Sequence, residues 1–374
     1  MTSVPFSQRE PQDLRVDIVI DNYNYAAFVE EALRSALAQT HPNVRVIVVD
    51  DGSTDRSREI LSTYADRVAV VLKENGGQAS ALNAGLARCE GDVVIFLDAD
   101  DVLGRETAAR VAAIFARGNG TVQVPYRLAV IDAHGRRNGH VKPPLDMELP
   151  AGEIAAAKLA FPFDVVSVGT SGNAFSLAAL RQITPIPEED FAACADWYLV
   201  HVMPLLGRIT PLDEIGGYYR VHGKNAYEPQ EIRVDLRHVR QTVRYAAVTR
   251  GALAQVADER GLEPPYGEIL SVSDVANRLI SLRLDRERHP EPGDTVPQLL
   301  RDGIRAATRR WDSPAAMKAV FILWFLLVAA APRPLLNPLA VAFLFRERRV
   351  GLNKLIYKLR NRHLRLDVKL DQRA

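Results

Sequence analysis

The sequence predicts an α/β fold with a parallel sheet over about the first 230 residues, followed by a helical extension. Short apolar runs that are typical of buried strands alternate with segments whose apolar residues recur at helical spacing. The expected strands are 16–20, 44–49, 68–72 and 93–97, and the expected helices are 26–39, 78–87, 106–116 and one that starts at Thr54 or Asp55. Such alternation is typical of parallel sheets with right-handed crossovers.

Polar clusters directly follow three of the expected strands, at residues 21–24, 50–53 and 98–101. The carboxyl ends of parallel strands meet at one edge of a sheet, and ligands of open α/β sheets bind at that edge. The sequence therefore predicts a binding site there.

The charge of the chain is small overall but unevenly distributed. The net charge is +1, which argues against a nucleic-acid-binding protein. Residues 346–374 hold ten Lys/Arg against three Asp/Glu, so this segment carries +7 and the other 345 residues carry −6. A basic tail on an acidic body predicts a local anionic partner such as a membrane surface.

Cysteine usage and the N-terminus bear on the compartment. The two cysteines, Cys89 and Cys194, have neither disulfide-framework nor metal-ligand spacing, and Met1 to Leu14 contains no apolar run of a signal peptide. We therefore expect a cytoplasmic protein, peripheral or re-entrant at the inner face of the cell membrane.

The third cluster contains three carboxylates, Asp98, Asp100 and Asp101. Like charges this close repel each other unless a proton or a cation compensates them. Carboxylate oxygens suit Mg²⁺ or Mn²⁺, which also bridge phosphates. The alternative is a solvated acidic loop that caps the next helix.

Two other clusters have both a structural and a functional interpretation. Asp50 and Asp51 precede Gly52 and Ser53, which suits a turn with a helix cap, or a carboxylate that binds a nucleobase or a ribose. The segment 75–78 contains Gly76, Gly77 and Gln78. It suits a simple turn, or a loop whose backbone approaches a ligand closely.

Taken together, these segments resemble glycosyltransferase family two, which has the A-type fold. The resemblance is carried, in matching order and spacing, by residues 16–24, 48–55, 75–85 and 91–101, and more loosely by 169–175, 196–197 and 219–222. It implies an inverting transferase that uses a nucleoside-diphosphate sugar, and Mn²⁺ or Mg²⁺ as its cofactor.

The resemblance also implies roles for the residues that bind the donor. Asp51 is similar to the carboxylate that holds the base, and Asp21 and Tyr23 lie where the first loop lines the nucleotide pocket. Asp98 resembles the motif's first Asp, near the ribose and the metal. Gly76 and Gln78 belong to the matching glycine segment. The family usually has Pro and a small residue where this chain has Asp21 and Asn22.

Three further roles concern the metal and the chemistry. Asp100 resembles the metal ligand that bridges to the diphosphate, and His222 resembles a late histidine near the diphosphate and metal. Asp196 lies where the family places its catalytic base, although Ala195 replaces the usual Glu before it. The apolar residues after Asp196 favour a raised pKa. The alternative for Asp196 is the N-cap of a helix over Trp197–Leu206.

We expect four parts in the chain. They are a flexible N-terminal tail (1–14), the catalytic domain (15–230), a helical appendage (231–313), and an apolar hairpin with a basic amphipathic tail (314–374). The apolar run 319–331 is short for a bilayer span and is followed by Pro332, Pro334 and Pro338, which favours a re-entrant or interfacial hairpin. The alternative is a soluble helix pair that packs on protein.

The function that we predict is sugar transfer to a glycan or lipid-linked hydroxyl acceptor in cell-envelope or exopolysaccharide biosynthesis. The alternatives are a catalytically inactive scaffold that binds sugar nucleotides, and a nucleotidyltransferase. The second alternative would be expected to need a basic pyrophosphate loop near the first strand, and residues 21–24 contain no basic residue.

Overall fold

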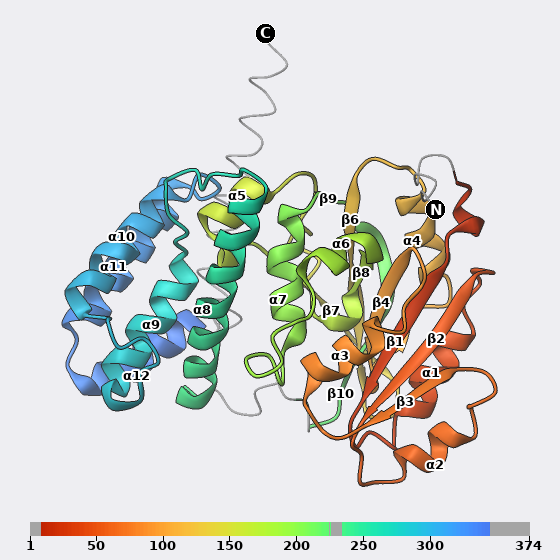
Figure 1. Ribbon diagram of the computed structural model, residues 1–374. Helices are drawn as coiled ribbons and strands as arrows, with labels where there is room; N and C mark the ends of the chain where they lie inside the picture. Colours follow the sequence, from red (N-terminus) through yellow and green to blue (C-terminus); the bar gives the residue numbers. More distant parts are fainter. Residues whose placement is uncertain (1–8, 224, 226–233, 345–374) are drawn as a thin grey trace. The chain divides into compact units, whose positions relative to one another are not determined.

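The computed structural model describes residues 9–223, 225 and 234–344 (Figure 1). The described residues form two compact units. The first lies within residues 1–158, 165–228 and 252–261, and the second within 159–164, 229–251 and 262–374.

The first unit is built on a mixed sheet. Ten strands of the described chain take part, in the order β3-β2-β1-β4-β8-β6-β10-β5, with β7 and β9 paired to β6. The strands are β1 (Val16–Asn22), β2 (Val44–Asp51), β3 (Ala69–Lys73), β4 (Val93–Asp98), β5 (Val102–Leu103), β6 (Thr121–Asp132), β7 (Arg137–Lys142), β8 (Asn173–Ser176), β9 (Arg208–Ile209) and β10 (Leu212–Val221). The four strands expected from the sequence run parallel, side by side, as Figure 1 shows.

Helices of the first unit connect these strands, and all four expected from the first 116 residues are present. They are α1 (Val29–Leu37), α2 (Ser57–Ser62), α3 (Gln78–Leu86) and α4 (Thr107–Phe115). Later helices are α6 (Leu177–Ile183) and α7 (Ala195–Val202), while α5 (Ala155–Ala160) and α8 (Leu236–Glu259) each contribute residues to both units. Short 3₁₀ turns occur at η2 (Pro11–Asp13), η3 (Pro162–Asp164), η4 (Thr170–Gly172), η5 (Met203–Leu205) and η6 (Arg286–Arg288).

The central strands are covered on both faces, which is why they read as continuous apolar runs. Val16, Ile18, Val19 and Ile20 of β1 are all fully buried. The register pairs Asp21 of β1 with Asp98 of β4 at the carboxyl end of the sheet. The polar clusters therefore lie at the edge that the sequence predicted.

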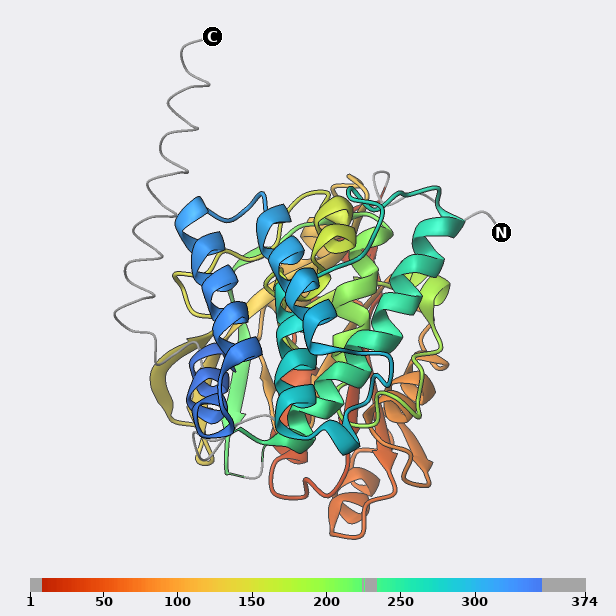
Figure 2. The ribbon, with the colours of Figure 1, turned by 90° about the vertical axis from the view of Figure 1, so that its left-hand side faces the viewer.

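The second unit is helical. Besides the first part of α8, its helices are α9 (Val272–Leu284), α10 (Val296–Arg309), α11 (Ala315–Ala330) and α12 (Arg333–Leu344). Figures 1 and 2 show α10, α11 and α12 in blue beside α9, and they share one core that includes Leu279, Leu299 and Phe325. Among the described residues, no helix is long and apolar enough to cross a membrane.

The expected apolar hairpin corresponds to α11 and α12. The first helix ends before Pro332 and the second begins at Arg333. Pro338 does not end the second helix, because it lies inside α12. The basic amphipathic segment expected after Phe345 lies outside the described residues.

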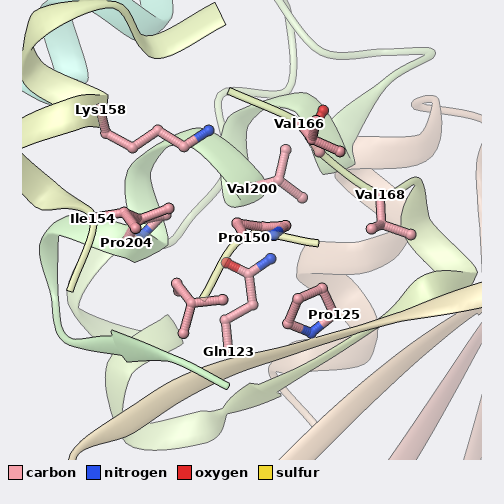
Figure 3. Close-up of a pocket in the computed structure, with 11 residues that line it drawn as sticks. Gln123, Pro125, Pro150, Ile154, Lys158, Val166, Val168, Val200 and Pro204 are labelled. Carbon is pink, nitrogen blue, oxygen red and sulfur yellow. The ribbon is translucent and has the colours of Figure 1, made fainter. Parts of the chain in front are cut away.

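A buried lysine and a buried histidine meet in the first unit. Nζ of Lys158 lies 3.0 Å from Nδ1 of His201, and the two residues are 1% and 2% exposed. Lys158 also lines a small pocket with Gln123, Val200 and Pro204 (Figure 3). Burial lowers the pKa of Lys158 to about 7, and burial together with the charge of Lys158 lowers the pKa of His201 well below its ordinary value.

This pair predicts a pH-dependent stability. Unfolded lysine has a pKa of about 10.4, so between about pH 7 and 10 the unfolded chain binds a proton that folded Lys158 does not. The free energy of unfolding should therefore rise with pH in this window, by up to about 1.4 kcal/mol per pH unit from Lys158.

Urea unfolding of the wild type and of Lys158→Met at several pH values measures this contribution. The variant should show a shallower rise than the wild type, because methionine fills similar space without a charge. Parallel profiles would mean that Lys158 is charged in the folded protein.

Candidate active site

The acidic loop after β4 gathers three carboxylates at the sheet edge. Asp98 is the last residue of β4, and Asp100 and Asp101 lie in the turn that leads to β5. One oxygen from each of the three lies within 4.8 Å of the others. Asp101 is 1% exposed, and its Oδ2 has no hydrogen-bond partner among the described residues. Three hard oxygen donors around one point, one of them unsatisfied, fit Mg²⁺ or Mn²⁺.

Three aspartates of the site have raised pKa values, because of their burial and because little positive charge lies near them. Burial, and then the neighbouring carboxylates, raise the pKa of Asp98 and of Asp101 well above the ordinary value. Burial and the charge of Asp100 raise the pKa of Asp21 to about 7. Carboxylates held this close to one another favour protonation, or a bound cation.

Arg220 is the buried cation that holds the acidic loop in place. This residue at the end of β10 is 1% exposed; its backbone N–H donates to Asp101 Oδ1 (2.9 Å) and its Nε donates to the Asp100 carbonyl (2.7 Å). Its guanidinium also donates to Glu31 Oε2 of α1 at 2.6 Å and lies over the ring of Phe28. Arg220 thus ties β10 and α1 to the loop after β4.

His222 reaches the same loop from two residues further on. Its Nε2 lies 2.9 Å from Asp100 Oδ2, and its ring packs against Phe28 (4.9 Å between centroids) and Tyr25 (5.6 Å). The structure therefore brings together Asp100 and His222, the two residues expected at the metal. The carboxylates of Asp98 and Asp101 suit a hard cation better than the imidazole of His222 does, because such cations prefer oxygen ligands.

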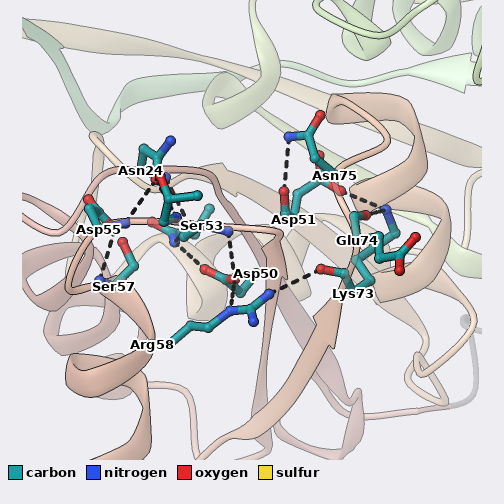
Figure 4. Close-up of polar contacts among 12 residues, drawn as sticks. Asn24, Asp50, Asp51, Ser53, Asp55, Ser57, Arg58, Lys73, Glu74 and Asn75 are labelled. Atoms are coloured by element: carbon teal, nitrogen blue, oxygen red, sulfur yellow. Dashed lines mark hydrogen bonds and ion pairs between the residues drawn. The ribbon is translucent and has the colours of Figure 1, made fainter.

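Asp51 binds the glycine turn that follows β3. Its carboxylate accepts hydrogen bonds from the N–H groups of Gly76 (3.0 Å) and Gly77 (2.7 Å) and pairs with Lys73 Nζ (2.6 Å). The neighbouring Asp50 instead pairs with Arg58, as Figure 4 shows, and it accepts a hydrogen bond from the side chain of Asn22. In this structure Asp51 fixes the shape of the turn, and its oxygens are 3.0 Å or less from three donors.

The glycine turn needs its glycines. Gly77 has φ +83°, and a Cβ there would lie 2.5 Å from the Ala192 carbonyl oxygen. The turn therefore packs directly on the segment that precedes α7, which carries Asp196.

Gln78 links the acidic loop to that segment. Its side-chain amide donates to Asp98 Oδ1 (3.0 Å), and its carbonyl accepts from the N–H of Ala195 (3.0 Å). One side chain thus contacts the carboxylate loop and the first residue of α7. The exposed Tyr23 (46% exposed) lies in the loop after β1, at the same sheet edge.

Asp196 lies in the first turn of α7 and is half-buried. Its Oδ1 accepts from Cys194 Sγ (3.2 Å) and from the N–H of Trp197 (3.0 Å). Burial raises its pKa, and its charge contributes to the raised pKa values of Asp98 and Asp21. The helix begins one residue before Asp196 and its N-cap residue is Cys194, so Asp196 is not the N-cap.

The comparison with known families follows the same motifs. The profile described as "Glycosyl transferase family 2" matches residues 17–167, which carry β1 to β4 and the acidic loop. Residues 17–167 thus carry the sequence of a glycosyltransferase family 2 domain. Its fold is the A-type fold of nucleotide-sugar transferases.

Two related proteins match this chain in sequence. An uncharacterized glycosyltransferase of Nostoc is 34% identical over 219 residues, which are 57% of this chain and 66% of that protein. The putative teichuronic acid biosynthesis glycosyltransferase TuaG of Bacillus subtilis is 43% identical over 90 residues, or 23% of this chain and 36% of its own.

The matches leave part of each relative uncovered. They span 66% of the Nostoc protein and 27% of a Rickettsia prowazekii glycosyltransferase, so the chain covers less than two thirds of these relatives.

Among solved structures, TarS residues 1–349 of S. aureus in complex with UDP is similar, with a TM-score of 0.53, 18% identity, and coverage of 85% of this chain and 87% of that one. This likeness concerns the fold.

Two contributors to this family 2 site were not predicted from the sequence. Lys73 pairs with Asp51, and Arg220 holds the acidic loop. Arg220 lies within the string 219–222 that carries the resemblance, but no local pattern indicates that an arginine about 120 residues after the loop is buried against it.

The contacts of Arg220 predict its contribution to stability. Arg220→Lys keeps the charge but loses the fork that reaches the Asp100 carbonyl and Glu31. We expect the free energy of unfolding to fall by about 1–3 kcal/mol, since the carbonyl of the buried Asp100 loses its donor.

Arg136→Lys is the matched control, because Arg136 pairs with Asp132 on the surface and its side chain is 75% exposed. It should cost less than about 0.5 kcal/mol. Denaturant unfolding of both variants measures the difference, and equal losses would contradict the role given to Arg220.

Proposed function

We propose that this chain is an inverting, divalent-metal-dependent glycosyltransferase that moves a sugar from a nucleoside diphosphate to a hydroxyl acceptor. The observation that supports the proposal most strongly is the pairing of two features at one sheet edge. The carboxylates Asp98, Asp100 and Asp101 lie within reach of a single cation, and the half-buried Asp196 is close enough to influence the pKa of Asp98.

The donor side is assigned to residues at the carboxyl ends of β1, β2 and β4. Asp100, with His222 beside it, and the neighbouring Asp98 and Asp101 would hold Mn²⁺ or Mg²⁺. The cation would neutralise charge on the departing diphosphate. The nucleotide would lie along the residues that the family resemblance assigns to it, which are Asp21, Tyr23, Asp51, Gly76, Gln78 and Asp98.

The fixed turn supports this assignment in a particular way. Asp51 holds Gly76 and Gly77 in position, so its contribution to nucleotide binding includes the shape of the loop as well as any contact with the base. A preorganised loop loses less conformational freedom when it binds a ligand.

Asp196 is assigned as the general base. The acceptor hydroxyl attacks the anomeric carbon as the bond to the diphosphate oxygen breaks, and the hydroxyl proton passes to the Asp196 carboxylate. Burial raises the pKa of Asp196, which makes the carboxylate a better proton acceptor. One base and one in-line displacement invert the anomeric centre.

The acceptor class is proposed as a glycan or a lipid-linked hydroxyl of the cell envelope. The name of one relative supports it, because TuaG of Bacillus subtilis is described as a putative teichuronic acid biosynthesis glycosyltransferase. A screen by thermal shift with UDP, GDP, dTDP and CDP, each with and without Mn²⁺, would identify the base.

The metal assignment predicts the behaviour of Asp100→Asn. The variant keeps the size of the side chain but loses a charged oxygen, so the increase in melting temperature given by the preferred nucleoside diphosphate with Mn²⁺ should largely disappear. Asp66→Asn, an equivalent change at an exposed aspartate, is the control and should retain the shift. An Asp100→Asn variant that responds like the wild type would remove Asp100 from the metal site.

The base assignment predicts a separation of binding from turnover in Asp196→Asn. The donor-induced melting shift should remain, while kcat for transfer should fall by about 10²–10⁴-fold. Asp190→Asn, at an exposed residue before α7, should leave both unchanged. Near-native kcat in Asp196→Asn would exclude the base role, and loss of donor binding would make Asp196 a structural residue.

A further inference from the structure

Helix α11 of the second unit has one side in the core and one side exposed. Trp324, Phe325 and Val328 are buried. On the opposite side, Leu323, Leu326 and Leu327 are 57%, 45% and 46% exposed. The exposed apolar residues of α11 that recur at helical spacing form a stripe that we call the α11 face: Ala319, Leu323, Leu326, Leu327 and Ala330.

The α11 face offers almost nothing that a protein partner could hydrogen-bond. Between Lys318 and Arg333 every residue is apolar, and the one side-chain polar group, Trp324 Nε1, donates to the Leu339 carbonyl at 2.9 Å. Protein interfaces usually contain about one hydrogen bond per 100–200 Å², whereas the hydrocarbon of a lipid layer requires none. Leu335, at the start of α12, adds a further exposed leucine (54%).

The charge of the sequence that follows indicates an anionic occupant. Residues 346–374, which come directly after α12, carry ten Lys/Arg and three Asp/Glu. An anionic lipid surface would offer hydrocarbon to the leucines and negative charge to the basic segment.

The length of α11 favours a helix that lies along the surface. Its 16 residues would span about 24 Å, less than the roughly 30 Å of a bilayer core, and its other side packs within the unit.

We propose that the α11 face docks this protein on an anionic membrane surface, with the leucines in the lipid interface. The proposal is independent of the catalytic assignments, because it uses residues of the second unit alone.

Flotation of the full chain with vesicles tests it. The wild type should float with vesicles of phosphatidylcholine and phosphatidylglycerol, more weakly with phosphatidylcholine alone, and should be only partly released by salt. Leu323→Gln combined with Leu327→Gln should lower the partition coefficient by at least about tenfold, because two apolar side chains no longer enter the lipid. Leu145→Gln, the same change at a 73% exposed leucine of the first unit, should float like the wild type.

Three outcomes would overturn the proposal. They are a wild type that does not float, a double variant that floats as well as the wild type, and a wild-type dimer in light scattering that becomes monomeric in the double variant. The third outcome would identify the α11 face as an interface between copies. Circular dichroism checks that the double variant is folded, and Leu326→Gln alone repeats the flotation test if it is not.

Discussion

The main physical constraint on the site is the repulsion among four carboxylates that the fold places close together. Parallel pairing of β1 with β4 sets Asp21 beside Asp98, and the turn after β4 adds Asp100 and Asp101. Few of these charges are compensated by protein groups, and Arg220 is the buried cation that contacts the loop. Much of the remaining architecture, from the stacking of Phe28 to the Gln78 bridge, keeps these oxygens at fixed positions despite their repulsion. A bound divalent cation would compensate the negative charge of such an arrangement.

The same contacts join the two halves of the proposed reaction. Gln78 contacts Asp98 on one side and the first residue of α7 on the other, and Gly77 packs against Ala192 in the segment before that helix. The position of Asp196 is therefore set by the turn that Asp51 holds. In this arrangement the preorganised turn also positions the residue proposed as the base, which is consistent with the need for precise alignment of nucleophile and leaving group.

The sequence was informative where the determinants are local. Strands β1, β2 and β4 are largely buried on both faces, so they appear as continuous apolar runs, and the carboxylates at their carboxyl ends lie at the sheet edge. The sequence could not reveal contacts made by later strands. Arg220 meets the acidic loop only because β10 pairs with β5 and β6, and Lys158 meets His201 across 43 residues of chain. Proline was also a poor guide in one place, since Pro338 lies inside α12 rather than ending it.

The central claim is that Asp98, Asp100 and Asp101 hold a divalent cation, and a crystal soaked in MnCl₂ tests it most directly. Anomalous scattering recorded at the manganese edge should give a peak about 2.0–2.6 Å from carboxylate oxygens of these residues. A crystal of Asp100→Asn should show that peak strongly reduced. A wild-type crystal with no peak at the acidic loop, or with manganese only elsewhere on the chain, would contradict the account.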